Sequence, residues 1–170
     1  AEGPGEPWAV APGNVLLRAG SSDFAHDALR RRTRRAIRRG AATEVTEYLW
    51  DARDRLREVR LPGGERVAFT YDAFGRLLRK DVYAKPSANM ESAAPARTVR
   101  YLWQGFSLAA ELDSGRGTRV LVHGPGSFLP LLQQEQGGEV FAYVCDPVGT
   151  PLALFDARGA CAWRARATVW

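Results

Sequence analysis

The side chains in this sequence that could do acid–base chemistry are aspartates that recur along the chain, namely Asp51, Asp72 and Asp146. A catalytic acid works beside a matching base or nucleophile, and one enzyme does not need the same acid in every structural unit. An aspartate that recurs with a repeat is typical of turns, because its carboxylate accepts hydrogen bonds from the backbone amides that follow it. We therefore interpret these aspartates as turn residues and expect no catalytic residues and no enzymatic activity in this segment.

The remaining reactive side chains form no recognisable constellation. The histidines His26 and His123 lie far apart in the sequence, and Cys145 and Cys161 form neither a CxxC pair nor a Cys/His cluster. The sequence has no Walker loop, no HExxH zinc motif and no GxSxG nucleophile elbow. We expect no cofactor and no metal site. We interpret the cysteines as small apolar strand residues, with a disulfide between them as the alternative.

An internal repeat organises the chain. Residues 48–56 match residues 69–77, because in both segments an aromatic residue precedes an aspartate and Arg-Leu follows the aspartate at the same interval. More diverged copies begin at Phe24, Tyr101, Tyr143 and Phe155. The residues that we assign to the structural repeat motif are Tyr48, Trp50, Asp51, Arg55, Leu56, Tyr71, Asp72, Gly75, Arg76, Leu77, Asp146 and Gly149.

Each copy has the pattern of a β-hairpin. Val67, Phe69 and Tyr71 alternate with smaller residues, and this period of two is typical of a strand with one apolar face. Asp72 then starts a turn, and Gly75 can supply the left-handed conformation at the turn exit without a Cβ penalty. We expect further turns at residues 61–64 and 137–138. The sequence therefore predicts an all-β fold of successive antiparallel hairpins, whose aromatic columns pack between neighbouring hairpins or, alternatively, form a sugar-binding strip.

The positive charge of the chain is concentrated in one stretch. The sequence has 24 basic and 19 acidic residues, and residues 29–39 contain the arginines 30, 31, 32, 34, 35, 38 and 39. Such a run could bind nucleic acid or form a basic helix with Leu29, Thr33 and Ile37 on one face. However, it lacks the interleaved aromatic residues of base-stacking surfaces, and Arg31 is in register with Arg55 and Arg76. We therefore predict a strand pair here and no nucleic-acid partner.

The pattern x-Tyr-Asp-x-x-Gly-Arg-Leu resembles the YD repeats of RHS proteins. Residues 72–77 keep the whole pattern, and residues 51–56 keep it except that Asp54 replaces the glycine. Residues 123–131 and 145–166 resemble the end of bacterial RHS cores, although the family usually has His-Leu where this chain has Pro147 and Val148. The resemblance extends, with gaps, over roughly residues 12 to 170.

This resemblance implies a strip of a curved, hollow β-shell that encloses a C-terminal toxin domain. Bacteria export such proteins in competition with other cells or in insecticidal toxin complexes. The implied partners are flanking RHS repeats, a toxin domain of the same protein and a secretion-system component, and the implied location is secreted or at the cell surface. The family's aspartate-based self-cleavage motif would lie beyond Trp170, so no protease residues are assigned. The alternatives are an adhesin-like YD module that binds glycans or cell surfaces, and an RHS fragment without function.

The sequence also predicts a division of the chain. Residues 1–12, rich in Gly, Pro and Ala, are expected to be a linker or a degenerate repeat, and residues 13–83 to hold YD repeats. Residues 84–97 lack periodicity and contain two prolines, so we expect an inserted loop there. Residues 98–170 would form the C-terminal part of the RHS core. No apolar run approaches the roughly 18 residues of a membrane span, and we expect both ends to be cut from a longer chain.

Overall fold

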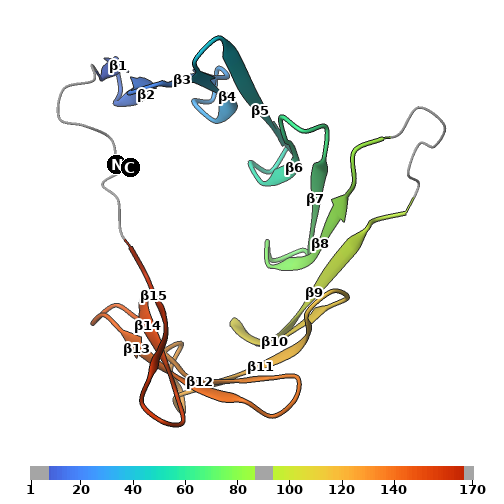
Figure 1. The fold of residues 1–170 in the computed structure, drawn as a ribbon, viewed down its shortest axis with the longest axis vertical. Helices are drawn as coiled ribbons and strands as arrows, with labels where there is room; N and C mark the ends of the chain where they lie inside the picture. The colour runs from blue at the N-terminus through green and yellow to red at the C-terminus, as the bar shows by residue number, and fades with distance from the viewer. Residues whose placement is uncertain (1–7, 87–93, 167–170) are drawn as a thin grey trace. The chain divides into compact units, whose positions relative to one another are not determined.

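The computed structural model describes residues 8–86 and 94–166 and contains only strands and turns in that part of the chain (Figure 1). The predicted all-β fold of antiparallel hairpins is confirmed. The strands are β1 (Ala9–Ala11), β2 (Val15–Ala19), β3 (Ser22–His26), β4 (Arg32–Arg39), β5 (Ala42–Trp50), β6 (Leu56–Arg60), β7 (Arg66–Tyr71), β8 (Leu77–Tyr83), β9 (Arg97–Gln104), β10 (Ser107–Asp113), β11 (Gly117–His123), β12 (Pro130–Glu135), β13 (Val140–Cys145), β14 (Pro151–Asp156) and β15 (Cys161–Arg164).

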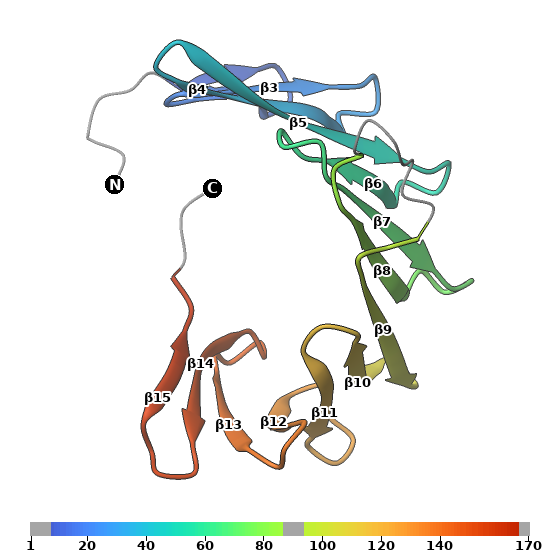
Figure 2. The ribbon, with the colours of Figure 1, turned by 45° about the vertical axis from the view of Figure 1, so that its right-hand side comes forward.

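The hydrogen-bonded order of the strands follows their order in the chain. Pairing is antiparallel from β1 through β7 and from β9 through β15, so each strand meets its sequence neighbour through a short turn (Figure 2). The chain divides into two compact units. The first comprises residues up to Thr70 together with residues 80–96, and the second comprises Tyr71–Arg79 with the residues from Arg97 onward.

Seven turns in the described residues share one hydrogen-bond pattern. The amide of the first residue donates to the carbonyl four residues later, and the amide of the fourth residue donates back to the carbonyl of the first. The fourth residue is left-handed, as in a three-residue loop built from a type I turn and a bulge residue. The expected turns at residues 61–64 and 137–138 have this form, and the seven first residues are Asp27, Asp51, Leu61, Asp72, Glu135, Asp146 and Asp156.

The arginine-rich stretch has β-structure, as predicted, but it forms a turn and one strand and not both strands of a pair; the alternative of a basic helix is wrong. Residues 29–31 lie in the turn between β3 and β4, and β4 contains the remaining arginines. Because side chains alternate along a strand, Arg34 and Arg38 lie on one face of β4 while Arg35 and Arg39 lie on the other. The positive charge is thereby divided between two surfaces.

Burial in both units is shallow. No large side chain among the described residues is fully buried, and the buried apolar residues are Ala36, Val99, Ala110 and Ala153. The aromatic columns are half-buried, including Tyr48, Trp50, Tyr101 and Trp103. The opposite face carries exposed residues such as Glu47, Thr70 and Arg100. Each unit therefore has a half-buried aromatic face in place of a closed core.

Two expected segments fall partly outside the described residues. Of the expected linker or degenerate repeat, residues 1–7 lie outside, and β1 follows them at Ala9–Ala11. Of the expected inserted loop at 84–97, residues 87–93 lie outside, and β9 begins at Arg97. The division at these boundaries stays a prediction.

Across the described ranges, we find no helix with the length and apolar character that a membrane crossing requires.

Candidate functional site

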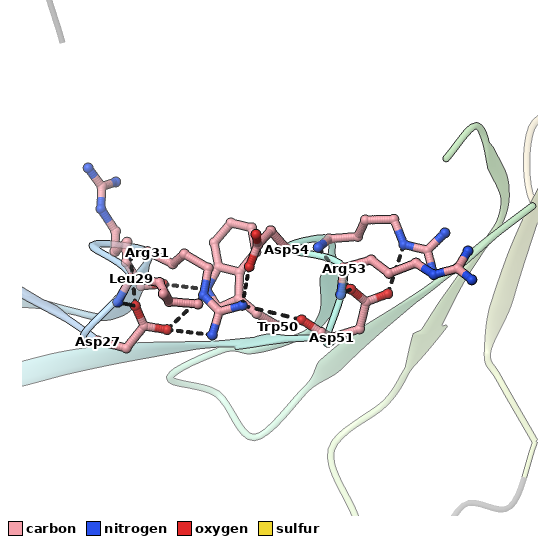
Figure 3. Close-up of polar contacts among 9 residues, drawn as sticks. Asp27, Leu29, Arg31, Trp50, Asp51, Arg53 and Asp54 are labelled. Atoms are coloured by element: carbon pink, nitrogen blue, oxygen red, sulfur yellow. Dashed lines mark hydrogen bonds and ion pairs between the residues drawn. The ribbon is translucent and has the colours of Figure 1, made fainter. Parts of the chain in front are cut away.

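A polar arrangement that recurs in the described residues is built on the repeated aspartates. Asp72 Oδ1 accepts hydrogen bonds from the amides of Phe74 and Arg76, each at 2.9 Å, while Oδ2 accepts one from Arg76 Nε at 2.6 Å. The turns at Asp27 and Asp51 repeat these three bonds at 2.7–3.0 Å (Figure 3). One carboxylate thus satisfies two turn amides and one guanidinium. We call this arrangement the Asp–Arg clamp, formed by the pairs Asp27/Arg31, Asp51/Arg55 and Asp72/Arg76.

The later copies keep the turn without the clamp. Asp146 Oδ1 accepts from the amides of Val148 and Thr150 at 3.0 and 2.8 Å, and Gly149 is left-handed with φ of +92°. Thr150 stands where the clamps have arginine, so the carboxylate has no guanidinium partner from its own turn. The copy at Tyr101 keeps only the hairpin, because Gln104 pairs directly with Ser107 across a two-residue turn.

The clamp stabilises the ionised form of each aspartate. The hydrogen bond from the Arg31 side chain is the largest cause that lowers the pKa of Asp27. For Asp51 the largest cause is the hydrogen bond from the Arg55 amide. Partial burial is the largest single influence on the pKa of Asp72 and would raise it, but the hydrogen bonds from Arg76 and Phe74 and the charge of Arg76 together lower the pKa. A carboxylate with a lowered pKa is a poor proton acceptor near neutral pH, so these aspartates suit structure and not acid–base catalysis.

In the first unit the clamp also contacts the next hairpin. The Arg31 guanidinium lies 6.0 Å from the centre of the Trp50 ring, and its Nη1 donates to the Asp51 carbonyl at 3.2 Å and to Asp54 Oδ1 at 2.7 Å (Figure 3). Trp50 Nε1 returns a hydrogen bond of 2.8 Å to the carbonyl of Arg32. The turn between β3 and β4 is therefore tied to the end of β5 in both directions.

The second unit contains the same link. The Arg76 guanidinium lies 5.9 Å from the Trp103 ring and donates to the Gly105 carbonyl. Trp103 Nε1 donates to the Leu77 carbonyl at 2.8 Å. In both units the tryptophan bonds to the residue that follows the clamp arginine. We call this arrangement the tryptophan link, and it fixes the position of one hairpin against the next.

The other residues assigned to the repeat motif lie where the hairpin pattern requires them. Leu56 and Leu77 begin the return strands β6 and β8. Tyr48 and Tyr71 are half-buried strand residues. Sequence reasoning missed that Arg30 and Asp54 adopt the left-handed position that Gly75 fills, with φ of +63° and +59°. It also missed the tryptophan link, for which the available signal was a tryptophan directly before the turn at residues 50 and 103.

A second polar cluster lies on the aromatic face of the second unit. Arg119 lies between Glu111 and Glu135, at 3.3 and 2.9 Å. Gln133 donates to Glu135 at 2.8 Å and accepts from the Tyr143 hydroxyl at 2.5 Å. Burial raises the pKa of Tyr143, so this hydroxyl remains protonated. Every group in the cluster has a partner, which makes it a bracing network across four strands.

Metal and thiol chemistry receive no support from the geometry. The described residues contain no group of three His, Cys, Asp or Glu side chains that could hold a metal ion. Both cysteines are free, so the alternative of a disulfide is not realised. Burial raises the pKa of the Cys145 thiol, whose Sγ contacts the Pro130 carbonyl, and a thiol with a raised pKa is unreactive.

Gly75 allows a direct test of the turn geometry. Its φ is +85°, and a Cβ added there would meet nothing within 4 Å, so only the backbone conformation opposes a side chain. We expect Gly75→Val to destabilise the chain by about 1–3 kcal/mol, because β-branched residues are strained in the left-handed region. Gly75→Asn is the matched control and should lose much less. Urea unfolding measured by pulse proteolysis checks this, and equal losses in the two variants would contradict it.

The comparisons with known proteins agree with this architecture. Residues 50–84 match the family model described as RHS Repeat, and residues 140–170 match the model described as RHS protein. The chain is 32% identical to the Probable deoxyribonuclease RhsA of Dickeya dadantii, over 81% of this chain and 9% of that protein. It is 25% identical to the Double-stranded DNA deaminase toxin A of Burkholderia cenocepacia, over 79% of this chain and 11% of that protein. It is 28% identical to the Toxin protein Tse5 of Pseudomonas aeruginosa, over 99% of this chain and 14% of that protein.

Successive antiparallel hairpins, tied together by Asp–Arg clamps and tryptophan links, define a β-hairpin repeat protein. The family matches then specify which kind: the chain belongs to the RHS repeat family and resembles segments of RHS toxins. It spans only 9–14% of the length of the three relatives named above.

Proposed function

We propose that this chain is a wall segment of an RHS shell that encloses a C-terminal toxin domain of the same protein until it is delivered to another cell. The observation that carries this proposal is the tryptophan link. It uses the clamp arginines and a tryptophan of the following hairpin to hold one hairpin against the next. Such groups serve the continuity of a sheet and offer no reacting centre for a substrate.

The partners in this proposal are flanking RHS repeats, the toxin domain and a secretion-system component, and the location is outside the producing cell. The names of the relatives include a deoxyribonuclease and a DNA deaminase. We place any such activity of the longer protein in its toxin domain and none in this segment. The lowered pKa values of the clamp aspartates support this division, because these carboxylates are poorly suited to proton transfer.

Protection of the C-terminal domain in the full-length protein tests the proposal. We expect limited proteolysis to leave that domain intact in the wild-type protein and to degrade it in the double variant Trp50→Ala/Trp103→Ala, which removes both tryptophan links. Phe74→Ala is the control, because Phe74 is a turn aromatic that is 75% exposed. A C-terminal domain digested in the wild-type protein as fast as it is alone would contradict enclosure.

A glycan-binding module is the second candidate, favoured by a hollow on the second unit. This hollow has a volume of about 570 Å³, and its lining combines aromatic side chains with charged ones, including Phe141, Tyr143, Trp163, Arg116 and Glu139. Aromatic faces beside planar polar groups are suited to sugars. Binding of the chain to a glycan array that is lost in Trp163→Ala would favour this role, and an array without binding would exclude it for the glycans displayed.

A further inference from the structure

Two arginines of β4 lie on the aromatic side of the first unit without a carboxylate partner. The bulge in the pairing of β3 with β4 skips Thr33 and so places Arg32 on the same face as Arg35. Arg31 is held in its clamp, while Arg38 and Arg39 pair with Asp23 and Glu44 at 2.7 and 2.9 Å. Arg32 and Arg35 are half-buried and make no ion pair with any described residue. The arginine-rich stretch is thus neutralised by carboxylates at Arg31, Arg38 and Arg39, and on the aromatic side it is left open at these two.

The two arginines surround one aromatic ring. Arg35 is the cross-strand partner of Phe24, and the guanidinium groups of Arg32 and Arg35 lie 4.4 and 6.0 Å from the centre of the Phe24 ring. Arg35 Nη2 donates to Ser22 Oγ at 3.3 Å. His26 pairs with Arg32 across the strands. We call this surface the Phe24 patch, formed by Phe24, His26, Arg32 and Arg35.

Three polar atoms of the Phe24 patch are buried without a hydrogen-bond partner, namely His26 Nδ1, Arg32 Nε and Arg35 Nε. An N–H group withdrawn from water without a partner is unfavourable, and charged groups are the most unfavourable. A guanidinium stacked on a ring is already ordered, and its planar fork matches the two oxygens of a carboxylate. The Nε atoms themselves are withdrawn from the surface, so a carboxylate would bond the terminal Nη atoms of these half-buried side chains. The patch therefore has the chemistry of a site for an anionic partner that approaches this face.

We propose that the Phe24 patch binds carboxylate side chains of an acidic polypeptide segment that packs against this face of the sheet. The number of open cations favours a peptide over a nucleic acid, whose affinity comes from neutralising a run of phosphates. The patch offers two guanidinium groups, and Arg31, Arg38 and Arg39 of the same stretch are already paired with carboxylates, so no long run of free cations extends from it. Phe24 is also covered by Arg32, so it is not free to stack a base. This inference holds whether or not the chain encloses a toxin.

The test uses the 170-residue chain, biotinylated at one end and immobilised at low density so that neighbouring copies do not associate. The probes are a short peptide rich in glutamate, its glutamine counterpart and a single-stranded DNA oligonucleotide of equal charge, followed by biolayer interferometry at low salt. We expect the glutamate peptide to bind, the glutamine peptide not to bind, and the DNA to bind more weakly than the glutamate peptide. Arg32→Gln/Arg35→Gln should weaken peptide binding about tenfold or more, the loss expected for one charge-assisted pair.

Two further variants separate a specific site from general charge. Arg34→Gln/Arg53→Gln removes the same charge from exposed positions of the same unit and should change the affinity by less than about twofold. Arg32→Lys/Arg35→Lys keeps the charge but loses the fork, so it should bind clearly more weakly than the wild-type chain. An equal loss in the Arg34/Arg53 control, tighter binding of the DNA, or no binding of the glutamate peptide would each overturn the proposal.

Discussion

Replacing Trp103 with alanine is expected to destabilise the second unit by about 2–4 kcal/mol, which is below the full cost of a buried tryptophan because Trp103 is half-buried. The substitution removes the ring that lies beside the Arg76 guanidinium and the hydrogen bond from Nε1 to the Leu77 carbonyl. It also leaves that carbonyl without its side-chain donor. Pulse proteolysis in urea, at a concentration that keeps the chain dispersed, measures the loss without relying on tryptophan fluorescence.

Two control variants separate the parts of the tryptophan link. Trp103→Phe keeps a ring beside Arg76 but loses the donor, so it should lose about 0.5–1.5 kcal/mol, the usual value of one hydrogen bond. Phe74→Ala removes an exposed ring that also lies near Arg76, at 5.4 Å, and should change the stability by less than either Trp103 variant. If Phe74→Ala and Trp103→Ala had the same effect, the link would be no more than a surface contact.

The hairpin pattern could be predicted because its determinants are local. Asp72 and Gly75 specify a turn through the hydrogen bonds of one side chain and the conformational freedom of one residue, and both effects act within five residues. The same reasoning predicts the strand at Arg32–Arg39. Arg31 occupies the repeat position of Arg76, so the turn pattern extends to this arginine-rich stretch in spite of its unusual composition. Even there the prediction depended on the repeat and not on strand propensity.

The sequence marks the two tryptophans, but the partners of the tryptophan link could not be predicted because they belong to different hairpins. Trp50 and Arg32 are 18 residues apart, and their contact depends on the stagger between strands, which bulges alter. The unpaired arginines of the Phe24 patch could not be identified from the sequence for a similar reason. The sequence shows seven arginines in one run, and only the pairing of β3 with β4 and β5 reveals which of them meet carboxylates.

The isolated 170-residue chain is expected to be poorly soluble or to self-associate, while the same residues in the full-length protein should be ordered and resistant to protease. Among the described residues, β1 pairs only with β2 and β15 only with β14, so each leaves one edge open. Open strand edges template pairing with other chains. The second unit also exposes aliphatic residues in one cross-strand row, where Leu102 and Val120 flank Ala110 and are 51% and 44% exposed. Exposed apolar rows of this kind promote association.

Sedimentation velocity over a range of concentrations measures this self-association, with reductant present because Cys161 is exposed. Val10→Lys places a charge on the open strand β1 and should shift the distribution toward smaller species, since charged edge residues block pairing. Ala52→Lys adds the same charge in an exposed turn and should leave the distribution unchanged. A wild-type chain that remained monomeric at every concentration and unfolded in one cooperative transition would show that the edges need no neighbours. The wall-segment proposal requires neighbouring strands that pair with these edges, so this result would contradict it. An independent binding module would then explain the chain better.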